Sequence, residues 1–188
     1  MGLILREKAE YLGTFRWLEV FLMETLARWV PTTPEMEIKV LMGRHIWDAA
    51  QHADALGKRT FELRAPLHYT LTPLAPYLEF LKELAPVEDT PSRLQAIYDV
   101  LLPALTAKYQ EYLNGSDSLL DEPSYRVIHG ILSDFTRMRQ ENEALREEFK
   151  GTLVFDASRA EQWRRKEAEI AEIVHRGSGA TLAVEAHA

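Results

Sequence analysis

Apolar residues recur every three or four positions through most of the chain, the spacing that places them on one face of a helix. Four long segments and a fifth near the end show this pattern, at about residues 4–30, 34–65, 91–114, 121–150 and 157–176. A short helix is expected near 73–85. The one possible extended stretch lies at 151–155. The pattern therefore predicts an all-α protein.

Residues that begin or end helices mark the boundaries of these segments. A threonine N-cap followed by proline at the first helical position is a strong start signal, and it occurs at 33–34, 72–73 and 90–91. Asp-Glu-Pro at 121–123 follows the same logic, and Ser-Arg-Ala-Glu at 158–161 matches a capping box. Helix ends are expected before Pro31, before Pro66, at Asn114-Gly115 and at Gly151.

The lengths of the connections predict how the helices pack. The first and third connections are short, whereas the one at 66–90 could run back along a whole helix, since a helix advances only about 1.5 Å per residue. This arrangement is a four-helix bundle with a crossover between its second and third helices. Residues 1–156 are expected to form the bundle, and 157–188 an additional C-terminal helix and a tail, flexible after Gly177. Pro103 is expected to kink the third long helix.

Composition narrows the functional classes. The 188 residues, 46% apolar and 27% charged, fit one globular domain. A net charge of −7 argues against nucleic-acid binding. The absence of cysteine excludes disulfides, thiolate metal sites and thiol nucleophiles. Neither a secretory leader nor an apolar stretch long enough to cross a bilayer is visible. A cytoplasmic protein that binds neither nucleic acid nor membrane is expected.

Several groups that can bind metal share helix faces. His45, Asp48 and His52 follow one another at i, i+3 and i+7, which places them on one side of a helix. The same spacing relates three residues of the fourth long helix, namely Glu122, Tyr125 and His129. A solvated helix face and a cluster that converges in the interior are both consistent with this spacing.

Glu19 lies within an apolar stripe of the first helix, where a carboxylate is costly unless it finds a partner. If the first two helices fold back near residue 32, Glu19 and His45 lie equally far from the turn. They would then face each other across the helix pair, with His52 deeper in the bundle. Carboxylates and imidazoles that project inward from facing helices build the dimetal sites of helical bundles.

This layout resembles the ferritin-like superfamily, whose di-iron and di-manganese members carry Glu on the first and third helices and Glu-x-x-His on the second and fourth. Glu19, His52 and His129 match ligand positions, while Ala49 and Arg126 stand where the family has Glu. The resemblance implies a ferritin-like four-helix bundle with iron or manganese as cofactor. The order His-x-x-Asp-x-x-x-His at 45–52 is also similar, with reversed spacing, to a motif of haem-oxygenase-like di-iron oxidases.

Residues one turn away could replace the missing carboxylates. His45 and Asp48 could stand in for position 49, and Glu122 and Tyr125 for position 126. Each also has a simpler interpretation: Asp48 could orient a neighbouring imidazole, and Glu122 could interact with a helix N-terminus. The candidate metal ligands are Glu19, His45, Asp48, His52, Glu122 and His129.

Two functions follow from these residues. The first is a metal-dependent oxidoreductase that activates O₂ or peroxide to oxidise an unidentified small substrate. The second is a metal-free bundle that binds a small molecule or a protein partner, with its polar core locked by an Arg126–Glu122 pair and by His–Asp hydrogen bonds. In the second case Arg126 would take the place of a lost metal, because a buried cation can substitute for one electrostatically. A homodimer is expected from the surplus of aromatic and apolar residues.

Overall fold

The computed structural model describes residues 3–67 and 69–175, and the all-α prediction is confirmed for them. Their regular structure is helical apart from a single β-bridge between Lys150 and Leu153, within the stretch for which extended structure was considered. Among these residues, no helix combines the length and apolarity needed to cross a membrane. The predicted flexible tail after Gly177 lies outside the described residues.

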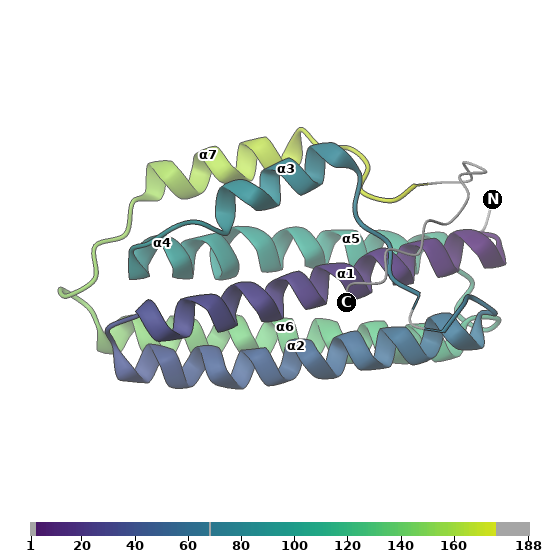
Figure 1. Ribbon diagram of the computed structural model, residues 1–188, viewed down its shortest axis with the longest axis horizontal. Coiled ribbons are helices and arrows are strands. Elements are labelled where there is room, and N and C mark those ends of the chain that lie inside the picture. Colours follow the sequence, from purple (N-terminus) through teal and green to yellow (C-terminus); the bar gives the residue numbers. More distant parts are fainter. Residues whose placement is uncertain (1–2, 68, 176–188) are drawn as a thin grey trace.

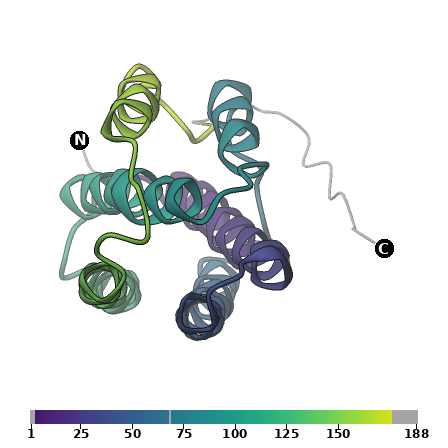
Figure 2. The same cartoon turned by 90° about the vertical axis from the view of Figure 1, so that its left-hand side faces the viewer.

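The helices form three layers (Figures 1 and 2). The middle layer contains α1 (Leu5–Trp29) and the third long helix, which consists of α4 (Thr90–Leu94), η2 (Gln95–Leu101) and α5 (Leu102–Gly115). On one side lie α2 (Met36–Glu62) and α6 (Glu122–Glu148), and on the other α3 (Ala75–Leu84) and α7 (Ala157–Ala168). The outer face of the α2–α6 layer is therefore not covered by another described helix.

The long connection between α2 and α4 follows from the directions in which the long helices run. A short link that includes η1 (Val30–Thr32) makes α1 and α2 antiparallel, and another short link joins α5 to α6 (Figure 1). Residues 63–89 return along the bundle through α3, so that α4 begins beside the α1–α2 turn. The crossover thus places α5 and α6 against the first helix pair.

Four predicted N-caps are wrong by one or two residues, among them Thr72, because the N-cap of α3 is Leu74. Thr33 does not cap α2, because its hydroxyl donates to the carbonyl of Trp29 at 2.9 Å and α2 begins at Met36. The caps of α4 and α7 are Asp89 and Asp156, whose carboxylates accept backbone N–H groups of the first turn. A carboxylate just upstream is a stronger acceptor than the predicted Thr90 or Ser158 hydroxyl.

Pro103 was expected to kink the third long helix, and a π-helical segment lies directly before it. The seven residues Gln95–Leu101 form a π-helical segment, and the N–H of Leu102 donates to the carbonyl of Ile97, five residues back. Proline at the second position of α5 has no N–H to continue the α-helical pattern. The wider turn absorbs this interruption and sets the rotation of Tyr98, which belongs to the site described below.

Buried charges close both ends of the bundle. At the α1–α2 turn, Arg93 is only 4% exposed and donates to the Trp29 carbonyl and the Thr33 hydroxyl. At the other end, Asp121 is 1% exposed and accepts hydrogen bonds from Arg59 and Tyr112 at 2.8 and 2.7 Å. Burial raises the pKa of Asp121, but these hydrogen bonds outweigh it and the net pKa is lowered. Between these ends the core is apolar and aromatic, with Phe15 of α1 packed against Tyr109 of α5.

The crossover packs so closely on α1 that a glycine is needed there. A Cβ added to Gly13 would lie 2.9 Å from the ring of the buried Tyr69, whereas one added to Gly130 of α6 would meet nothing within 4 Å. We expect Gly13→Ala to destabilise the fold by about 1–3 kcal/mol through overpacking. Gly130→Ala should stabilise it by about 1 kcal/mol through helix propensity. Urea unfolding of both variants measures these changes in the free energy of unfolding. Equal changes in the two variants would contradict the close packing at Gly13.

Candidate functional site

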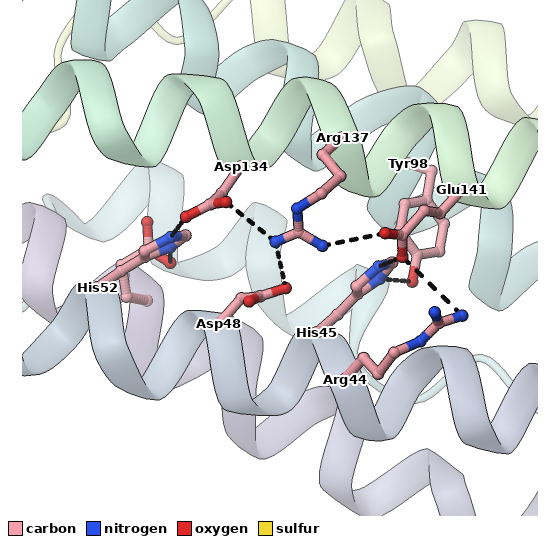
Figure 3. Close-up of polar contacts among 9 residues, drawn as sticks. Arg44, His45, Asp48, His52, Tyr98, Asp134, Arg137 and Glu141 are labelled. Carbon is pink, nitrogen blue, oxygen red and sulfur yellow. Dashed lines mark hydrogen bonds and ion pairs between the residues drawn. The ribbon is translucent and has the colours of Figure 1, made fainter.

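The facing surfaces of α2 and α6 carry polar side chains that complement one another (Figure 3). On α2 these residues have the spacing i, i+3 and i+7, and on the antiparallel α6 they have the same spacing. They form three cross-helix pairs, which we call the polar ladder: His45–Glu141, Asp48–Arg137 and His52–Asp134.

The His52 pair continues into the dry interior. Asp134 contacts Nε2 of the imidazole at 3.1 Å, and Glu19 of α1 contacts Nδ1 at 3.1 Å. Glu19 is completely buried, and its second oxygen accepts the hydroxyl of Tyr109 at 2.7 Å. Both oxygens of this costly carboxylate are therefore hydrogen-bonded, and the contact ties α1, α2, α5 and α6 together.

The His45 pair reaches inward in the same way. Its Nε2 lies 3.1 Å from Glu141, and its Nδ1 lies 2.7 Å from the hydroxyl of Tyr98. Tyr98 stands on the π-helical segment and is 1% exposed. Burial raises the pKa of Tyr98, so the phenol stays protonated. Each ladder histidine thus joins a carboxylate of α6 to a group in the core.

Arg137 forms the middle pair and holds three carboxylates. Its guanidinium contacts Asp48 at 2.8 Å, Asp134 at 3.0 Å and Glu141 at 3.1 Å. Its side chain is 40% exposed, so solvent screens these attractions in part. The guanidinium is the central cation of the ladder, while Arg44 lies 4.0 Å from Glu141 at one end (Figure 3). The planar fork of Arg137 bridges both ladder histidines through their carboxylate partners.

The two histidines have opposite proton preferences. Burial lowers the pKa of His52, but the charge of Glu19 and the hydrogen bonds to Glu19 and Asp134 outweigh burial, so its net pKa is raised. Burial also lowers the pKa of His45, and there the attraction of Glu141 does not overcome it. His52 therefore favours the charged form in the folded protein, and His45 favours the neutral form.

This difference predicts opposite pH dependences for two variants. Because the folded-state pKa of His52 is raised, its stabilisation is complete below its ordinary value of 6.5 and is lost as the pH rises through the folded value. The cost of His52→Gln in the free energy of unfolding should thus be larger at about pH 6 than at about pH 8.5. His45 has a lowered pKa, so His45→Gln should cost more at the higher pH. Urea unfolding across this range measures both, and parallel profiles would contradict the assignment.

The ladder's geometry bears directly on metal binding. The two nitrogens of an imidazole point in divergent directions, and in His52 Glu19 occupies one side and Asp134 the other. A single ion bound to either nitrogen could not also be reached by both carboxylates. Within the described part of the chain, no three histidine or acidic side chains converge in a way that could hold a metal ion. The residues present therefore do not fit the predicted centre.

The predicted site residues divide into two groups. Four of them take part in the polar contacts described above: Glu19, His45, Asp48 and His52. Glu19 was expected to face His45, but it contacts His52, whereas His45 contacts Tyr98 and Glu141. The expectation that Glu122 and His129 point inward is wrong, because both are exposed. Glu122 pairs with Arg126 at 2.7 Å on the surface of α6, so that Arg126 is not a buried substitute for a metal either. Their face of α6 is rotated away from α2.

Five members of the network were missed by sequence reasoning: Tyr98, Tyr109, Asp134, Arg137 and Glu141. The spacing Asp134-x-x-Arg137-x-x-x-Glu141 was visible and matches that of His45, Asp48 and His52. Opposite charges in matched spacing on two helices were the available signal. The two tyrosines carried no such signal, because their contacts depend on how the third long helix is rotated.

The chain was compared with known proteins. Neither a protein-family model, nor a curated protein, nor a solved structure matches it.

Proposed function

We propose that the protein is a metal-free, ferritin-like helical bundle that serves as a protein-binding module. The observation that carries this proposal is the position of Arg137, whose guanidinium contacts Asp48, Asp134 and Glu141 at 2.8–3.1 Å. A built-in cation balances the acidic groups that a bundle of this type would present to metal ions. The order of the long helices, with a crossover between the second and the third, supports the ferritin-like assignment.

The binding face of this module is the outer surface of α2. Its inner surface is tied to α1 and α6 by the polar ladder, so the helix is held in one position. On the outer surface Met36, Val40 and Trp47 are 64%, 56% and 65% exposed and share one stripe. Gly43 lies between them, and a Cβ there would meet nothing within 4 Å. A glycine in an exposed helix costs about 1 kcal/mol, and it allows another helix to approach closely.

The partner that this stripe fits is a second copy of the chain. If two α2 helices cross antiparallel at a point between Gly43 and Arg44, residues whose numbers add up to 87 lie at the same height. Val40 then lies opposite the partner's Trp47. The apolar stripe can thus pack against its own copy, as a two-fold interface requires. Tryptophan in the centre of such a contact is a typical source of binding energy.

Sedimentation over a wide concentration range tests this interface. We expect a monomer–dimer equilibrium whose dissociation constant rises by about tenfold or more in Trp47→Ser, because the central aromatic contact is lost. Leu119→Ser is the matched control: Leu119 is 85% exposed on the α5–α6 connection and should not affect association. A wild-type protein that stays monomeric throughout, or equal effects of the two variants, would refute the dimer.

The second candidate is the iron- or manganese-dependent oxidoreductase predicted from the sequence. One observation favours it: Glu19 of α1 and Asp134 of α6 contact the two ring nitrogens of His52, so two carboxylates from separate helices lie beside one imidazole. Elemental analysis of protein purified without chelator, from cells supplied with iron and manganese, separates the two functions. We expect well below one metal ion per chain. About one or more per chain, lost in Glu19→Ala/His52→Ala and kept in Glu122→Ala/His129→Ala, would overturn the metal-free proposal.

A further inference from the structure

The end of α2 has an unusual residue at a position that favours glycine. The N–H of Arg64 donates to the Phe61 carbonyl at 2.9 Å, and that of Ala65 to the Thr60 carbonyl at 3.1 Å. These paired hydrogen bonds define a helix ending in which the residue at position 64 adopts a left-handed conformation, usually as glycine. Arg64 has φ 66°, and it is the one non-glycine residue with positive φ among the described residues. A residue with a side chain is strained in this backbone conformation, so arginine at position 64 costs folding energy.

A cavity of about 520 Å³ adjoins this residue, between the start of α1 and the end of α2. This volume is within the range of small-molecule sites. Its walls are mainly apolar, and the side chains that shape them are Ile4, Leu5, Leu63, Pro66 and Tyr69. Ile4 and Leu5 are 62% and 52% exposed, so a ligand in the cavity would cover apolar surface that now faces water.

The charge at the cavity comes from Arg64. Arg6 also lines the cavity, but its guanidinium pairs with Glu10 at 2.9 Å. Within residues 3–67 and 69–175, the Arg64 guanidinium takes part in no hydrogen bond or ion pair. The cavity also lies at the N-terminal end of α1, whose dipole favours negative charge. An apolar wall therefore stands beside one cation without a partner.

We propose that this cavity binds a small amphipathic anion, with its apolar body against Leu63 and Tyr69 and its carboxylate on Arg64. A guanidinium holds a carboxylate through two parallel hydrogen bonds, which glycine at position 64 could not provide. The site uses neither the polar ladder nor the outer face of α2, so it is independent of the function proposed above. Glycine at position 64 would relieve the backbone strain but would remove the cation. The proposed role therefore explains why an arginine stands there.

Isothermal titration with decanoate, kept below its micelle concentration, tests the proposal. We expect one decanoate bound per chain, and an affinity lower by about tenfold or more in Arg64→Gly, because a charged hydrogen bond is lost. The same variant should melt at a higher temperature than the wild type, since the left-handed strain is relieved. Absence of decanoate binding by the wild type, or wild-type affinity in Arg64→Gly, overturns the proposal.

Three controls separate the contribution of the Arg64 charge to binding from that of the apolar wall. Decanol, which lacks the carboxylate, should bind the wild type and Arg64→Gly equally. Ala65→Phe, which fills the cavity, should abolish binding of both probes without removing the cation. Arg126→Ala removes an exposed arginine of α6 and should leave decanoate affinity unchanged. A loss of decanoate affinity in Arg126→Ala equal to that in Arg64→Gly would show that net charge, and not the cavity, attracts the anion, and would refute the site.

Discussion

The buried carboxylate of Glu19 is the constraint on which the centre of this bundle depends. A fully buried carboxylate is unstable unless both of its oxygens are hydrogen-bonded and its charge is balanced. Tyr109 satisfies one oxygen and His52 the other, and His52 in turn is held on its far side by Asp134. One carboxylate therefore fixes the relative positions of four helices. The aromatic packing of Phe15 on Tyr109 excludes water from this contact.

The rest of the ladder follows from the same requirement. Asp134 lies close to Asp48 and Glu141, and Arg137 reduces the repulsion among these three carboxylates because it reaches all of them. The charged groups of the ladder thus find their partners within the chain. The buried charges of Arg93 and Asp121, at the two ends of the bundle, are paired in a similar way. Because the polar groups of the ladder pair with one another, the two binding surfaces proposed above lie elsewhere: the apolar stripe of α2 and the cavity beside Arg64.

Part of the candidate site could be found before the fold was known. His45, Asp48 and His52 share a helix face by geometry alone, and an acid in an apolar stripe, such as Glu19, must find a partner inside. Glu122 and His129 were assigned by their distance along α6, but depth in the bundle does not determine which way a helix is turned. The stabilising cation was expected at Arg126 for the same reason, whereas Arg137 lies on the face of α6 that meets α2.

The sequence by itself determined that the chain is helical, where its long helices break, and which side chains share a face, because these properties depend on interactions between residues a few positions apart. Tertiary structure decided the rotation of α6, the placement of Tyr98 by the π-helical segment, and the pairing of two polar faces into one ladder. It also decided that Arg64, at the end of α2, would stand beside a cavity formed with the start of α1. Such features depend on contacts between distant segments, where the burial of whole helix faces outweighs any local preference.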